Sequence, residues 1–172
     1  MNDTDKDGKT ALMITAWEGN VACAELLVQS GAGIDAMDKY DTTALMLAAS
    51  KGHEFIIKFL VHNGAKANDK NNSLMLAAKG GHLACVEVLV TNRADVDAKN
   101  RFGKTALMLA AEKGRWSCLN FLVSKGADVR AADNDGTTVL MIAAMEGRFS
   151  FVEFLVTSGA NYMLRTILAK LL

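Results

Sequence analysis

The chain has 172 residues, of which 51% are hydrophobic and 22% charged, enough apolar side chains to bury a core in one domain, residues 1–172. Its 19 basic and 19 acidic side chains give zero formal net charge, which argues against nucleic acid because such binders usually carry a basic face. No apolar run approaches the ~18 residues that span a bilayer, and the first residues are acidic and polar rather than signal-like. We therefore expect a cytoplasmic or nuclear protein that does not bind membranes.

A short pattern recurs five times along the chain: a Thr or its substitute, a small residue, then Leu and Met. The small residues lie 33, 29, 33 and 33 positions apart, and two sets of glycines or their substitutes follow at the same intervals. Self-similarity at such a period is typical of stacked repeats. The sequence predicts five copies, at about 4–36, 37–69, 70–98, 99–131 and 132–164.

Each copy predicts an inner helix, an outer helix and a projecting finger, most clearly in the fourth copy. Leu and Ala follow Thr105 at helical spacing, and the Thr105 hydroxyl can cap the first turn of the inner helix. Gly114 ends this helix. A second helical pattern over 116–123 ends at Gly126, a position suited to a left-handed residue. The polar segment 133–136 then predicts a tight turn at the tip of a finger.

These features resemble the ankyrin-repeat family, whose pattern has a period of about 33 residues and a Thr-Pro-Leu-His-x-Ala motif. Residues 5–12 and 31–32 fit the family pattern in the first copy, and 100–107 and 126–129 fit it in the fourth. The resemblance covers about 4–164. It implies an all-α solenoid of stacked helix-turn-helix units with hairpin fingers, no enzymatic activity, no cofactor, and a protein partner bound on the concave side.

All five copies depart from the family pattern at its Pro and its His. Ala, Ser or Val replaces the Pro, and Met replaces the His. The resemblance implies that the His hydrogen-bonds within and between turns, so we expect side-chain packing to replace these bonds and the fingers to be slightly looser. The methionines are Met13, Met46, Met75, Met108 and Met141.

The third copy is four residues shorter than its equivalents, between Ala65 and Ser73. The finger over 66–72 is therefore predicted to be clipped, which is either neutral loop variation or room for a protruding element of a partner. Arg93 replaces a Gly at a predicted left-handed position, a conformation that disfavours side chains. We expect neighbouring Asn92 to take up part of that conformation.

The carboxyl-terminal residues 165–172 are predicted to form a truncated capping helix with a thin polar face. Repeat arrays need polar terminal units for solubility, so two explanations stay open. The chain is a fragment of a longer array, or a weakly capped end associates with another chain.

Two motif fragments resemble ligand-binding loops but lack essential residues. Asp3, Asp5, Asp7 and Gly8 match half of a calcium loop, but Ile14 stands where that loop needs a bidentate Glu. The Gly-Lys-Thr triplets at 8–10 and 103–105 lack the glycine that a phosphate-binding loop places five residues earlier. Neither fragment predicts a metal or nucleotide site.

The cysteines and histidines occupy repeated positions rather than forming a cluster. Cys23, Cys85 and Cys118 share a position with an Ile and a Phe of the other copies, so we expect all three to be buried, reduced hydrophobic residues. His53 and His82 both follow the loop glycine, and we expect them to have a structural role. The sequence thus predicts no catalytic residue and no metal ligand.

Partner recognition is predicted at positions that vary between copies, namely the two residues before each loop glycine and the finger tips. Trp17, Tyr40 and Phe102 stand out because exposed aromatic side chains often anchor interfaces, although each could instead pack on a neighbouring finger. The candidate partner-binding residues are Trp17, Glu18, Lys39, Tyr40, Ser50, Lys51, Lys79, Arg101, Phe102, Glu112, Lys113, Met145 and Glu146.

Three functional hypotheses follow from these observations. The first is a non-catalytic scaffold that binds a protein partner of mixed polarity through the concave surface of fingers and inner helices. The second is a stoichiometric inhibitor or regulator of an enzyme such as a kinase, which the short chain and the clipped finger would suit. The third is a structural or self-associating unit of a longer array, suggested by the weakly capped ends.

Overall fold

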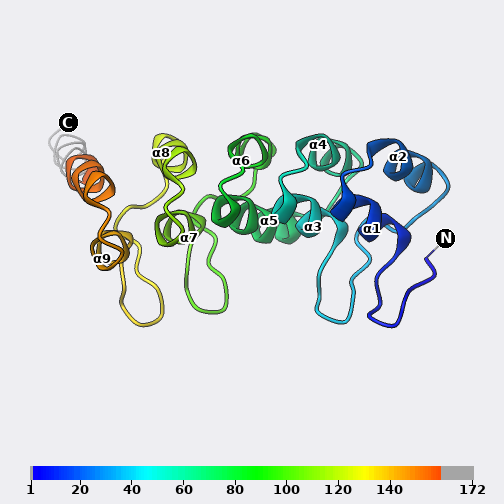
Figure 1. Ribbon diagram of the computed structural model, residues 1–172, viewed down its shortest axis with the longest axis horizontal. Coiled ribbons are helices and arrows are strands. Elements are labelled where there is room, and N and C mark those ends of the chain that lie inside the picture. Colours follow the sequence, from blue (N-terminus) through cyan, green and yellow to red (C-terminus); the bar gives the residue numbers. More distant parts are fainter. Residues whose placement is uncertain (1, 160–172) are drawn as a thin grey trace, which may run out of the picture.

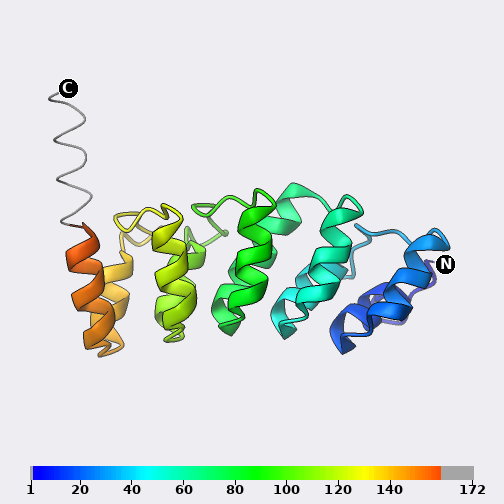
Figure 2. The same cartoon turned by 90° about the horizontal axis from the view of Figure 1, so that it is seen from above.

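The computed structural model describes residues 2–159, without the side chains of 67–70. Two rows of helices run along its length, with hairpin fingers projecting below the inner row (Figure 1). Figure 2 shows the outer helices side by side in the same order along the row. Residues 149–159 are also helical. The inner helices are α1 (Ala11–Glu18), α3 (Ala44–Lys51), α5 (Ala67–Gly80), α7 (Ala106–Glu112) and α9 (Val139–Met145), and the outer helices are α2 (Val21–Gln29), α4 (Glu54–His62), α6 (Leu83–Thr91) and α8 (Trp116–Ser124).

Four inner helices begin after a capping Thr, as predicted. The Thr hydroxyl accepts the backbone N–H of the Met three residues later, at 3.3 to 3.5 Å, at Thr10, Thr43, Thr105 and Thr138. Each such bond satisfies one of the N–H groups that a helix amino terminus leaves unpaired. In α1 the Thr10 N–H also donates to the sulfur of Met13 at 3.4 Å. The sulfur of Met13 therefore accepts a hydrogen bond, whereas packing alone was expected in place of the hydrogen bonds of the family's His.

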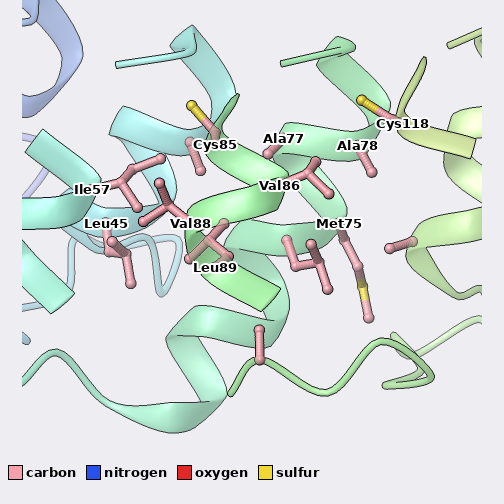
Figure 3. Close-up of a cluster of buried hydrophobic side chains, with 14 of the residues drawn as sticks. Leu45, Ile57, Met75, Ala77, Ala78, Cys85, Val86, Val88, Leu89 and Cys118 are labelled. Carbon is pink, nitrogen blue, oxygen red and sulfur yellow. The ribbon is translucent and has the colours of Figure 1, made fainter. Parts of the chain in front are cut away.

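The core forms where successive copies stack. Alanines of the inner helices, among them Ala16, Ala48 and Ala77, have no exposed surface, so neighbouring inner helices approach closely. Around them pack Leu, Ile and Val side chains from both rows, and Figure 3 shows Leu45 and Ile57 among them. The predicted all-α solenoid is confirmed for residues 2–159.

The cysteines lie in this core with one exception. Cys85 and Cys118 are buried free thiols within the cluster of Figure 3. Cys23 is exposed, so the expectation that all three are buried is wrong for this residue. Helices α4, α6 and α8 each pack against the outer helix before them. No outer helix precedes α2 within residues 2–159, so the same position stays open to solvent.

The third copy has no finger, which corrects the prediction of a clipped one over 66–72. Helix α5 instead begins at Ala67, six residues before the position where the other inner helices begin. No Gly or Pro lies between Ala65 and Gly80 to interrupt it, and helix keeps the backbone groups of this shorter segment hydrogen-bonded. Figure 1 shows two hairpins on each side of the molecule and none below α5.

The four remaining fingers, residues 3–10, 36–43, 98–105 and 131–138, are named fingers 1, 2, 4 and 5 after their copies. Each tip is closed by one Asp or Asn side chain whose oxygen accepts two backbone N–H groups, at 2.8 to 3.0 Å, the turn chemistry that these residues favour. In finger 1, the Lys9 N–H that donates to Asp5 holds the pKa of this carboxyl below its ordinary value. The closing residues are Asp5, Asp38, Asn100 and Asp133.

The prediction that Arg93 is left-handed is confirmed, with φ at 68°. Asn92 does not share the conformation, because its φ is −94°. Its side chain instead donates to the carbonyl of Val88 at 2.8 Å. Residues 165–172, the predicted capping helix, lie outside the described residues.

Candidate functional site

The missing third finger opens a cleft of about 1120 Å³ between fingers 2 and 4, here called the central cleft. Its floor is apolar and comes from the exposed edges of α3, α5 and α7. Leu76 and Leu109 are partly exposed there, with Met75 nearly buried beside them. The cleft therefore lies on the finger side of the inner helices, where the sequence placed the binding surface.

Aromatic side chains stand on both walls of the central cleft. Tyr40, at the tip of finger 2, is 73% exposed, and Phe102, at the tip of finger 4, is 56% exposed. Neither ring is buried against a neighbouring finger, which was the alternative considered for each. The Arg101 guanidinium lies over the Phe102 ring, 4.7 Å from its centroid, and adds a cation–π contact at that wall.

The rim of the central cleft carries both signs of charge. Lys104 donates to Glu112 across 3.1 Å, and this hydrogen bond with the nearby ammonium holds the pKa of the Glu112 carboxyl below its ordinary value. The charged residues that line the cleft are Lys79, Lys99, Arg101 and Lys104, and Asp41, Glu112, Asp133 and Asp135. Four charges of each sign suit a polar protein surface better than a polyanion.

A comparison with protein families settles the relationship of the chain. The family described as Ankyrin repeats (3 copies) matches residues 1–71 and 74–166. The chain belongs to the ankyrin-repeat family. Ankyrin repeats generally act as protein–protein interaction modules and are typically non-catalytic. A search of curated proteins found no match.

Six of the thirteen predicted partner-binding residues line the central cleft of this ankyrin-repeat protein. They are Tyr40, Ser50, Lys79, Arg101, Phe102 and Glu112. Of the other seven, Trp17 is 44% exposed on α1 with the Lys51 ammonium 3.8 Å from its ring centroid. Lys39 donates to the carbonyl of Lys6 in finger 1. The structure thus brings six of the candidates together at the gap and leaves a third exposed aromatic residue, Trp17, on α1.

The remaining four predicted residues, Glu18, Lys113, Met145 and Glu146, are also outside the central cleft. Lys113 pairs with Glu112 at 3.4 Å, and Glu146 pairs with Arg148 at 3.7 Å. Surface ion pairs of this kind contribute little to stability. Glu18 and Met145 are the last residues of α1 and α9, and Lys113 and Glu146 come directly after α7 and α9.

Sequence reasoning missed residues on the floor and one on a wall. Leu76 and Leu109 follow the repeated Met, a position to which the sequence analysis gave no role, and both are partly exposed on the floor. Asp41 was missed although it left a signal. It stands where the other fingers have Gly, and its φ is 57°, a left-handed value that side chains disfavour. A non-Gly residue held in this region is a recognised marker of functional segments.

A ladder of side chains links successive ankyrin repeats next to the site. His53 binds the Trp17 carbonyl at 2.9 Å, and His82 binds the Ser50 carbonyl at 3.2 Å. Arg115 and Arg148 occupy the same position in later copies and donate to the carbonyls of Lys79 and Glu112. The predicted structural role of the two histidines is confirmed, and each rung pairs a carbonyl that the end of an inner helix leaves free.

Among residues 2–159, no group of three or more His, Cys, Asp or Glu side chains is placed to hold a metal ion. No helix in the same part of the chain combines the length and the apolar character needed to cross a membrane.

Proposed function

We propose that this ankyrin-repeat protein is a non-catalytic module that binds a protein partner in the central cleft. One observation carries the proposal: exposed aromatic rings on facing fingers, Tyr40 and Phe102, flank an apolar floor that the absent finger leaves open. Binding sites for proteins concentrate their energy in such aromatic anchors around a desolvated centre. The mixed charges of the rim supply orientation rather than most of the affinity.

The fingers support this function because hydrogen bonds within each finger already close its tip. The tip of finger 2 is closed by Asp38, which accepts the N–H groups of Tyr40 and Thr42 at 2.8 and 2.9 Å. Asn100 closes the tip of finger 4 in the same way. Since the walls need little ordering on binding, less of the interaction energy is lost to entropy. We further propose a cytoplasmic or nuclear location, which the three free cysteines support.

The experiment compares partners captured by the wild type with those captured by the double variant Tyr40→Ala/Phe102→Ala. The matched control is Phe55→Ala, an aromatic side chain 69% exposed on outer helix α4. Quantitative mass spectrometry after affinity purification from cells that express the protein measures each partner. We expect a partner that the double variant loses by about tenfold or more and that Phe55→Ala retains.

Two outcomes would contradict the proposal. Every partner is retained by the double variant, or every lost partner is lost equally with Phe55→Ala. Trp17→Ala runs in parallel, because loss of partners with this variant alone would place recognition on α1 instead. If the partner is an enzyme, an assay of its activity with and without this protein separates inhibition from tethering.

A further inference from the structure

Neighbouring fingers are joined by a backbone hydrogen bond at a fixed position. The N–H of Lys39 in finger 2 donates to the carbonyl of Asp7 in finger 1, at 3.1 Å. The N–H of Asn134 in finger 5 donates to the carbonyl of Phe102 in finger 4, also at 3.1 Å. In both pairs the second residue of one tip bonds the third residue of the tip before it. The fingers thus form two pairs with one fixed register.

The absent finger leaves one acceptor and one donor of this register without their bonds. By the same register, the carbonyl of Tyr40 would accept from a third finger, and the N–H of Arg101 would donate to it. Among the described residues, neither group makes a hydrogen bond to another finger. Helix α5 packs between α3 and α7, so the space between the two groups corresponds to one finger.

The side chain of Asp41 points into the same space. The other fingers have a Gly at this position. The distance from an added Cβ to the next finger shows where a side chain there would point. A Cβ at Gly8 would lie 3.2 Å, and one at Gly103 2.6 Å, from a backbone nitrogen of the next finger. A Cβ at Gly136, with no described finger after it, meets nothing within 4 Å. The position tolerates Asp41 because no finger follows finger 2, and its carboxylate faces the gap.

Resting on the proposed function, we propose that the central cleft takes a tight reverse turn of the partner protein in place of the missing finger. The second turn residue donates its N–H to the Tyr40 carbonyl. The third accepts the Arg101 N–H. The apolar floor of the cleft covers the flanks of the turn.

The fingers themselves indicate the sequence of such a turn. Their tips read Asp-Lys-Asp-Gly, Asp-Lys-Tyr-Asp, Asn-Arg-Phe-Gly and Asp-Asn-Asp-Gly. The second residue is Lys, Arg or Asn, and in two fingers its side chain donates to the carbonyl of the second residue in the finger before it, as Lys39 does to Lys6 and Asn134 to Arg101. In the central cleft that donor would reach the Lys39 carbonyl beside the Asp41 carboxylate. The partner turn therefore has the form Asp/Asn-Lys/Arg-x-Gly, with the basic residue facing Asp41.

The probe is a disulfide-cyclised peptide that copies residues 98–105, the whole of finger 4. Titration into the isotope-labelled wild type, followed by NMR, is expected to shift the amides of Tyr40, Asp41 and Arg101 with saturation. A control peptide has Ala in place of its Asn and its Gly, the two residues that close the turn. It should bind about tenfold more weakly, the equivalent of one ~1.4 kcal/mol interaction.

The protein control restores the missing finger by replacing residues 66–72 with a copy of 95–105, the equivalent segment of the fourth copy. This variant should lose binding of the peptide by about tenfold or more, because its own chain fills the gap. A second variant, Asp41→Lys, should weaken binding of the peptide about tenfold. This test is valid whether or not the restored finger folds. Circular dichroism verifies that both variants fold.

The inference is overturned if the peptide does not bind the wild type, or if the control peptide or Asp41→Lys binds equally well. If the folded restored-finger variant keeps both the peptide and the partners that Tyr40→Ala/Phe102→Ala loses, the proposed function stands and the turn is wrong. If all variants keep the partners, the proposed function fails independently. A dimer of the wild type in sedimentation, absent from the restored-finger variant, would identify the occupant as a second copy and also overturn the inference.

Discussion

Ser73→Ala is expected to stabilise the protein, because Ser73 is fully buried and its hydroxyl has no hydrogen-bond partner in the part of the chain that the structure describes. It lies inside α5, at the position that Ala11, Ala44, Ala106 and Val139 occupy in the other copies. A buried polar group left without a partner costs ~1–3 kcal/mol. Ala is also the better helix former by ~0.5 kcal/mol. After some lost packing of the removed oxygen, the free energy of unfolding should rise by about 1–2 kcal/mol.

The assay is urea unfolding followed by circular dichroism, together with thermal melting. For a chain of this size the expected gain corresponds to a rise of roughly 2–8 °C in Tm. Ser124→Ala is the matched control, since Ser124 is exposed and its hydroxyl donates to the Phe121 carbonyl at 2.6 Å. It should change stability by less than about 0.5 kcal/mol. If Ser73→Ala is no more stable than Ser124→Ala, the Ser73 hydroxyl is hydrogen-bonded in solution and the reasoning is refuted.

Three further predictions concern the backbone and the thiols. Arg93→Gly should raise the free energy of unfolding, measured in urea, by about 0.5–1 kcal/mol, because Arg93 is exposed and its φ is 68°. The strain of a side chain at this left-handed φ exceeds the entropy that Gly adds to the unfolded chain. Gly52→Ala should lower it by about 2 kcal/mol, since φ is 81° and the new Cβ would lie 2.6 Å from the His82 ring. Gly64→Ala, with φ at 93° but open space around it, should lose only about half as much, and equal losses would contradict the role of the ring. Cys23 should react with a thiol reagent at pH 8 well before the other two cysteines, whose burial raises their pKa to about 11 and keeps them protonated below that pH; simultaneous reaction of all three in native protein would contradict the structure.

The repeat made most of the fold predictable from the sequence. Thr43 and Thr105 cap their helices as expected because the hydroxyl and the N–H that it accepts are three residues apart, a purely local relation. The same holds for the finger tips closed by Asp38 and Asn100. Local chemistry repeated at a fixed interval predicts both the elements and their stacking, since each copy packs mainly on its neighbours.

The failures have physical causes beyond the local pattern. Cys23 shares its sequence position with buried residues but lacks an outer helix before it, so its burial depends on context rather than residue type. The segment 66–72 was expected to remain a shortened loop, but a chain without Gly or Pro satisfies its backbone more fully as helix. Asp41 could have been noticed, because it alone replaces a finger-tip Gly.

The loss of the third finger and the unusual residues around it form one connected feature. Because α5 begins early, Asn72 lies inside the helix instead of capping it, and Ser73 is left buried without a partner. The same change leaves no finger next to Asp41, which lines the central cleft. The unpaired Ser73 hydroxyl, which lowers the stability of this copy, and the open central cleft therefore have the same origin in the early start of α5. Since the unpaired hydroxyl of Ser73 is buried, Ser73→Ala should raise stability and leave binding of the cyclic peptide unchanged. A loss of binding in that variant would show that the cleft depends on the Ser73 hydroxyl.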